Sequence, residues 1–344
     1  MPRPDMNPIS SPHITLLSVV VIGRNEGERL VRCLQSVRAM HDPGGAVEII
    51  YVDSDSRDNS VINAQGLDAK VIEVRPERPS AALGRNAGWR ESQGEFVLFL
   101  DGDTVLHPDF VAQSLGEFSN PKVAVVWGHR REIHPEQSLF NRVLDLDWIY
   151  PPGLSEFCGG DAIMRRSVLE QVDGFDANLI AGEEPELCQR IRALGYSILH
   201  VDRPMTGHDL AMTGWPAYWR RAFRAGYAYA DVADRLKDGP FPLWVREARR
   251  NRIHAMILLG LPIAGGGVGY AIGSWWPLVL VAASLGGLAI RTAVKVRWKA
   301  VGNPLTLLLY GIHSHLQQIP ICFGQIAWMR DRRNRQKRLL IEYK

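Results

Sequence analysis

The feature of this sequence that most constrains its fold is an apolar run, Phe96–Leu100, which ends at the acidic turn Asp101-Gly102-Asp103. A run of this length, closed by Asp and Gly, predicts a strand that is buried on both faces. In an open α/β sheet, ligands bind at the carboxyl ends of such strands. Two carboxylates at this spacing on a turn can face one divalent cation, which often accompanies a diphosphate. A solvated turn after a core strand is the simpler alternative, and the rest of the chain decides between the two.

The first part of the chain alternates apolar runs with stretches of helical spacing. The runs that we expect to be strands are residues 18–23, 47–53, 70–74, 95–101 and 123–127. Between them, residues 28–40 and 80–92 show the spacing of helices. Alternation of this kind is typical of parallel βαβ units with right-handed crossovers. The sequence therefore predicts an α/β fold with a Rossmann-like sheet that binds nucleotides.

The composition changes after residue 252. Residues 253–272 and 275–290 are apolar and contain no Asp, Glu, Lys or Arg; the first is long enough to span a bilayer and the second is at the lower limit. The net charge is only +3, but basic residues crowd around these stretches, as they do at a cytoplasmic membrane surface. We expect a helical hairpin over about 253–290, and the alternative is a buried hairpin in the core of a soluble domain.

A third apolar stretch, residues 304–329, has its apolar side chains on one helical face. A third crossing would place the basic tail on the outer side, against the positive-inside tendency, so we favour an amphipathic helix in the interface over three full spans. The expected organisation is a disordered tail (1–14), an α/β domain (15–240) and a membrane-associated helical region (241–344). The first dozen residues contain no apolar signal segment, which favours a cytosolic α/β domain.

Polar side chains also follow the first two predicted strands. Glu26 follows the first, and Asp53 ends the second, so both are expected at the same rim of the sheet as Asp101. Asp53 can accept hydrogen bonds from a nucleobase or a ribose, whereas residues 58–60 are better explained as a helix cap. Farther along, Arg85 can contact a phosphate, and it lies between Gly84 and Gly88, which allow close backbone approach.

In their order along residues 17–235, these segments resemble a family 2 glycosyltransferase of the GT-A fold. The matching segments are Val21–Glu26, Val52–Ser60, Gly84–Gly88, Asp101–Asp103, Phe157–Asp161, Gly174–Asp176 and Gly182–Leu187. Each is a weak signal alone, but the ordered set is specific. The resemblance implies transfer of a sugar from a nucleoside diphosphate sugar, foremost a UDP-sugar, usually with inversion at the anomeric carbon.

The resemblance also implies roles on the donor side of the reaction. Residues implied in binding the nucleotide sugar are Glu26, Asp53, Arg85, Asp101 and Gly160. Asp101 and Asp103 would hold Mg2+ or Mn2+ against the diphosphate, and His208 is a candidate for a further ligand. A purely structural role for His208 is the alternative.

On the acceptor side, the family places its general base in a Glu-Asp pair that opens a helix. Here the pair reads Glu183-Glu184, so either glutamate could act as the base, and Glu184 is the aligned residue. Acidic residues are also common in the first turn of a helix, where they interact favourably with the helix dipole. The upstream motifs favour the catalytic interpretation.

The function predicted from the sequence is that of a membrane-attached, inverting, metal-dependent glycosyltransferase. The Gln-x-x-Arg-Trp motif of chain-secreting relatives is absent from residues 215–224, which favours transfer of one sugar. The expected acceptor is a lipid-linked glycan at the cytosolic face of a bacterial inner membrane, as in exopolysaccharide or surface-glycan synthesis. The alternatives are a polyprenyl-phosphate glycosyltransferase and a non-catalytic membrane scaffold. No nucleic-acid partner is expected, because the basic residues gather around apolar segments.

Overall fold

The computed structural model describes residues 14–336, so the predicted tail at 1–14 and the end of the basic tail fall almost entirely outside the described residues. The chain forms two compact units. Unit 1 runs to Arg131 and resumes over Tyr150–Asp209, and unit 2 consists of Glu132–Ile149 and the chain from Leu210 onward. The predicted boundary at residue 240 therefore differs from the division in the structure, which groups residues 132–149 and 210–240 with the carboxyl-terminal helices.

Unit 1 is built on one mixed sheet, which has nine strands within residues 14–336. The strands are β1 (Leu16–Gly23), β2 (Ala46–Asp53), β3 (Lys70–Glu73), β4 (Phe96–Asp101), β5 (Thr104–Leu106), β6 (Val123–Glu132), β7 (Gly153–Ser155), β8 (Ala162–Arg165) and β9 (Ser197–His208). The spatial order is β3-β2-β1-β4-β8-β6-β9-β5, and β7 pairs with β9.

The first half of this sheet confirms the predicted parallel units. Strands β3, β2, β1 and β4 are parallel neighbours. The helices of unit 1 are α1 (Glu28–Arg38), α2 (Ser60–Gly66), α3 (Ala81–Glu91), α4 (Phe110–Ser114), η1 (Leu115–Ser119), α6 (Arg166–Gln171) and α7 (Glu183–Ala193). The second half differs, because β8 runs antiparallel to both β4 and β6, and β9 runs antiparallel to β5 and β7. The antiparallel pairing in this half was not predicted from the sequence.

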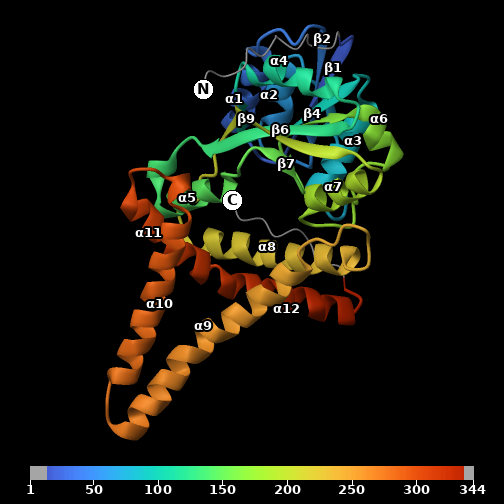
Figure 1. The fold of residues 1–344 in the computed structure, drawn as a ribbon. Helices are drawn as coiled ribbons and strands as arrows, with labels where there is room; N and C mark the ends of the chain where they lie inside the picture. Colours follow the sequence, from blue (N-terminus) through green and yellow to red (C-terminus); the bar gives the residue numbers. More distant parts are fainter. Residues whose placement is uncertain (1–13, 337–344) are drawn as a thin grey trace. The chain divides into compact units, whose positions relative to one another are not determined.

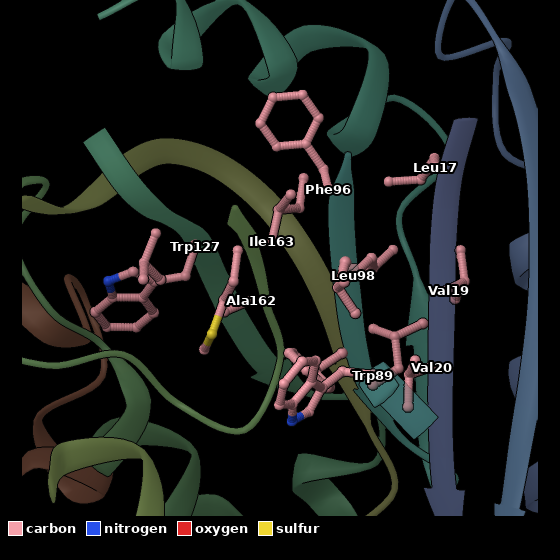
Figure 2. Packing of buried hydrophobic residues seen from close by; sticks show 14 of the residues in the cluster. Leu17, Val19, Val20, Trp89, Phe96, Leu98, Trp127, Ala162 and Ile163 are labelled. Carbon is pink, nitrogen blue, oxygen red and sulfur yellow. The ribbon is translucent and has the colours of Figure 1, made fainter. Parts of the chain in front are cut away.

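The apolar runs form strands because both of their faces are covered. Val19 and Val20 of β1 and Leu98 and Phe99 of β4 are all fully buried. Figure 2 shows Leu17, Val19, Val20 and Leu98 packed within one cluster of buried side chains. Burial of successive residues on opposite faces explains why these strands read as continuous apolar runs and not as alternating ones.

Helix α3 packs unusually close to the sheet. A Cβ atom on Gly88 would overlap the Val20 side chain, and one on Gly84 would lie 3.3 Å from Ile22 Cγ2. Ser80 caps the helix, because its hydroxyl oxygen accepts a hydrogen bond from the Leu83 amide at 3.3 Å. The two glycines thus let α3 pack closely against the sheet, and the same helix carries Arg85.

Unit 2 is helical apart from its connecting segments. Its helices are η2 (Pro135–Gln137), α5 (Leu139–Asp145), η3 (Leu146–Trp148), α8 (Trp215–Leu236), α9 (Val245–Ile272), α10 (Trp276–Lys295), η4 (Arg297–Lys299), α11 (Pro304–Leu316) and α12 (Gln318–Arg333). Within the described residues, α9 and α10 are the two helices long and apolar enough to cross a membrane. Only 17% of the most apolar 18-residue stretch of α9, and 11% of that of α10, is buried in the protein. The apolar side chains of both helices are therefore largely exposed. They form the hairpin expected over 253–290 (Figure 1).

The single helix expected over 304–329 is instead two helices, α11 and α12, which separate at Gln317. Pro320 explains the break, because its ring clashes with the carbonyl four residues earlier, at Leu316, and it lacks an amide hydrogen. The predicted apolar face survives on α11 as an exposed stripe. Leu305, Ile312 and Leu316 are 59%, 47% and 37% exposed.

Helices α8 and α12 touch backbone to backbone through two glycines. A Cβ atom on Gly226 would overlap the carbonyl oxygen of Ile321, and one on Gly324 would overlap that of Phe223. This close packing, which only glycine permits, explains why α8 belongs to unit 2 and not to the sheet domain. It could not be predicted from the sequence, because each glycine's partner lies about a hundred residues away.

We expect Gly226→Ala to lower the free energy of unfolding of unit 2 by about 1–3 kcal/mol, the usual cost of overpacking a close contact. Thermal unfolding in detergent would measure the effect. Gly260→Ala is the matched control, because this glycine of α9 has nothing within 4 Å of the added methyl group. Equal stability of the two variants would show that α8 and α12 do not pack this closely.

Candidate active site

The carboxyl ends of three neighbouring strands bring the predicted polar residues to one rim. Gly23 of β1 is in register with Asp53 of β2, and the adjacent Ile22 is in register with Asp101 of β4. The Glu26 side chain lies over the same rim, since Cβ atoms built on Gly23 and Gly102 would lie 3.1 and 3.2 Å from its Cγ. The pairing of parallel strands therefore brings together residues that are up to 75 positions apart in the sequence.

Asp53 is buried, with 1% of its surface exposed, and both of its carboxylate oxygens have partners. Oδ1 accepts a hydrogen bond from the Tyr51 hydroxyl at 2.8 Å, and Oδ2 accepts one from the Ser56 amide at 2.8 Å. Burial and the negative Asp53 both raise the pKa of Tyr51, which keeps the phenol protonated as a donor. Asp53 thus shapes the loop after β2 in addition to any contact with a ligand.

The acidic turn after β4 meets the end of β9. Strands β5 and β9 are antiparallel, and Thr104 is in register with His208. His208 Nε2 lies 3.2 Å from Asp103 Oδ2, and both side chains are at most 5% exposed. The Asp209 amide also donates to the Asp103 carbonyl at 3.0 Å. Two predicted ligands that are 105 residues apart in the sequence are therefore adjacent.

Arg85 joins the acidic turn to the carboxylate pair on α7. Its Nη2 lies 2.9 Å from Asp101 Oδ1, and its Nη1 lies 2.9 Å from Oε1 of both Glu183 and Glu184. The arginine side chain is only 2% exposed. Burial alone would lower the pKa of this guanidinium, but the nearby carboxylates outweigh it and raise the pKa, so the group stays charged. The nucleotide contact predicted for Arg85 stays a prediction beside these ion pairs.

Gly160 lies where these side chains converge. A Cβ atom on Gly160 would lie 2.8 Å from Arg85 Nη2, 2.9 Å from Asp101 Oδ2 and 3.3 Å from Glu184 Oε1. A side chain here would force apart the groups that form the site. The structure thus gives Gly160 a steric reason for being glycine.

The two glutamates differ in exposure and in proton affinity. The Glu184 side chain is 14% exposed and that of Glu183 only 5%. Burial raises the pKa of Glu184 to about 7, and the negative charge of Glu183 adds to this effect while Arg85 opposes it. Both residues lie in the first turn of α7, after Gly182 in a left-handed conformation (φ 84°). Glu184 is therefore the more accessible carboxylate, and its pKa is suited to accepting a proton near neutral pH.

Two further charged residues, Arg130 and Asp161, belong to this site, although no individual role was predicted for either from the sequence. Arg130 of β6 places Nη2 3.3 Å from Asp101 Oδ2 and Nη1 3.5 Å from Asp161 Oδ2. Asp161 precedes β8 and is 3% exposed. Four carboxylates (Asp101, Asp161, Glu183 and Glu184) therefore face two guanidinium groups. The signal in the sequence for Asp161 was its place in the matching segment Phe157–Asp161.

The side chains of this site include candidate ligands for a divalent cation. The described residues contain no group of three Asp, Glu, His or Cys side chains arranged to hold a metal ion. Asp103 and His208 do form a buried pair of suitable donors, whereas Asp101 faces two arginines. Mg2+ is commonly bound by one or two carboxylates together with substrate phosphates, so this pair fits a cation that shares its coordination with a diphosphate.

Comparison with known proteins supports the fold and shows which family the first part of the chain resembles. Residues 18–173 match the model of glycosyl transferase family 2. The chain is 27% identical over 341 residues to the pre-mycofactocin glycosyltransferase of Mycobacterium tuberculosis, a match that covers 93% of this chain and 67% of the relative. It is 24% identical over 230 residues to the glycosyltransferase AglE of Haloferax volcanii, covering 64% and 74% of the two chains.

Among solved structures, the chain resembles the mannosyltransferase PcManGT of Pyrobaculum calidifontis, determined in complex with GDP-Man and Mn2+. The TM-score is 0.66 at 19% identity, and the match covers 95% of this chain and 90% of the other. With this likeness and the mixed sheet, unit 1 has the fold of the GT-A glycosyltransferases. The family match agrees with this fold, and residues 18–173 are similar to glycosyl transferase family 2.

Proposed function

We propose that this protein transfers one sugar from a nucleoside diphosphate sugar, with inversion at the anomeric carbon, to a lipid-linked glycan. The observation that carries the proposal is the position of Arg85, which contacts both Asp101 and Glu184. An inverting transfer needs a base on the side of the sugar opposite the leaving diphosphate, to take the proton of the acceptor hydroxyl. Glu184, with its raised pKa, is the residue we assign to this step.

On the donor side, we assign Asp53, Glu26 and Gly160 to nucleotide-sugar binding, and the first two lie at the rim where β1, β2 and β4 end. Arg85 and Arg130 flank Asp101, and guanidinium groups bind phosphate oxygens well. Asp103 and His208 would hold Mg2+ or Mn2+, which stabilises the negative charge of a departing diphosphate. We expect a UDP-sugar or a GDP-sugar as donor, and the Pyrobaculum enzyme of similar fold was determined with GDP-Man.

The membrane part of the proposal rests on unit 2. The exposed apolar side chains of α9 and α10 are suited to a bilayer, and the exposed stripe of α11 is suited to its interface. Basic residues such as Arg291 and Lys295, at the carboxyl end of α10, favour the cytosolic side of a bacterial inner membrane. An enzyme that resides in the membrane meets a lipid-linked acceptor at a high effective concentration.

The decisive experiment is a screen of UDP-, GDP- and dTDP-sugars with the full chain in detergent, with and without Mn2+. We expect turnover of one donor class that depends on Mn2+, and at least a tenfold loss in Asp103→Ala, because this substitution removes a buried ligand candidate. Asp173→Ala is the control, since this aspartate is 89% exposed. Absence of turnover with every donor would overturn the proposal. Comparing bare polyprenyl phosphate with lipid-linked oligosaccharide would then identify the acceptor class.

A further inference from the structure

Asp161 is a buried carboxylate that the proposed mechanism does not use. It lies in the segment before β8, next to Gly160, and 3% of its surface is exposed. Charged side chains are rarely buried this deeply unless they have partners. The partners of Asp161 therefore indicate what it does.

Each oxygen of the carboxylate binds a different strand end. Oδ1 accepts a hydrogen bond from the backbone amide of Asp101 at 3.1 Å, where β4 enters the acidic turn. Oδ2 accepts one from the Thr206 hydroxyl at 2.6 Å, on β9. The guanidinium of Arg130 approaches the same Oδ2 at 3.5 Å. One side chain thus links β4, β6 and β9 beside the site.

The two hydrogen bonds reach the segments that carry the paired Asp103 and His208. Asp101 is two residues before Asp103, and Thr206 is two residues before His208. On β5 and β9, Thr206 is in register with Leu106, and His208 is in register with Thr104. Strand β9 therefore carries both Thr206, which binds Asp161, and His208, which contacts Asp103. The position of each candidate ligand therefore depends on a backbone segment that Asp161 holds.

We infer that Asp161 is a positioning residue, which fixes the acidic turn and the end of β9 so that Asp103 and His208 can bind a divalent cation together with a nucleoside diphosphate. This inference rests on the proposed function. Groups that orient metal ligands without touching the metal typically change metal affinity by about 10- to 100-fold when they are replaced. A carboxylate suits the position because both of its oxygens can accept hydrogen bonds while its charge attracts Arg130.

The test measures Mn2+ binding directly, by electron paramagnetic resonance of the free ion, in the presence of UDP or GDP and with the full chain in detergent. We expect Asp161→Ala to raise the Mn2+ dissociation constant at least tenfold. Asp161→Asn keeps one acceptor oxygen and should cause a smaller loss, and Thr206→Val, which removes only the hydroxyl donor, should also weaken binding. Glu186→Gln is the matched control, because Glu186 is a buried carboxylate that pairs with Arg190 on α7.

Unfolding temperatures in metal-free buffer separate positioning from folding. The inference predicts that Asp161→Asn and Thr206→Val bind Mn2+ more weakly while they unfold at the temperature of the unchanged protein. Unchanged Mn2+ affinity in these two folded variants would overturn it, whatever the fate of Asp161→Ala. If the unchanged protein binds no Mn2+ with either nucleotide, the metal-dependent function itself fails, and the inference fails with it for that distinct reason.

Discussion

Replacing Glu184 by glutamine is expected to lower kcat for sugar transfer by about 100- to 10,000-fold, the range that general-base catalysis contributes. Glutamine keeps the size of the side chain but cannot accept the proton of the acceptor hydroxyl. Binding of the nucleotide sugar should change little, because the substitution leaves Asp53, Asp103 and His208 in place. Single-turnover transfer, with donor affinity measured separately, would test this expectation.

The pH dependence provides an independent check on Glu184. Because its pKa is raised to about 7, activity should fall as the pH drops below neutral, whereas an ordinary glutamate would give this fall near pH 4 to 5. The residual activity of Glu184→Gln should lack this acidic limb. Glu186→Gln, in the same turn of α7, is the matched control. A larger loss in Glu183→Gln than in Glu184→Gln would assign the base to Glu183.

Replacing Arg85 by methionine is expected to lower the free energy of unfolding by about 3–5 kcal/mol at neutral pH, the usual effect of removing one partner from a buried ion pair. The arginine is 2% exposed, and its loss leaves Asp101, Glu183 and Glu184 without their shared cation. Chemical denaturation in detergent, followed by tryptophan fluorescence, would measure the change. Arg90→Met on the same helix is the control, since Arg90 and its partner Asp173 are 50% and 89% exposed.

The deficit of Arg85→Met should depend on pH in a defined direction. Burial and the negative charge of Glu183 raise the pKa of Glu184 in the folded state above its unfolded value, and loss of the guanidinium removes the charge that opposes this rise. Groups with raised folded-state pKa values lose their contribution to stability as the pH rises through those values. The variant should therefore be closer to the unchanged protein at pH 5 than at pH 8. A variant as stable as the unchanged protein at pH 8 would contradict the network described around Arg85.

Much of unit 1 could be predicted from the sequence, because the signals were local. The run ending at Asp101 forms a buried strand, as expected from its residue types. The parallel half of the sheet follows from strands and helices that alternate along the chain. The antiparallel half could not be derived in this way, since its pairs join strands that are distant in sequence and share no crossover helix.

The same contrast applies to the site. Asp101, Asp103 and the Glu183-Glu184 pair were recognised because each motif is continuous in the sequence. The partners of Arg85, and the roles of Arg130 and Asp161, depend on side chains that converge from separate elements. The division into units also depends on contacts between distant segments, because α8 joins the carboxyl-terminal helices through contacts at Gly226 and Gly324.

The sequence by itself determined which segments form the parallel strands, which are apolar enough for a membrane, and which residue types stand at the ends of those strands. These properties depend on side-chain chemistry and on the short periods of helices and strands. Only the tertiary structure decided that one guanidinium binds both the acidic turn and the glutamate pair, and that Asp103 lies against His208. Such pairings arise from the packing of distant segments, and periodicity along the chain carries no information about which distant segment a side chain will meet.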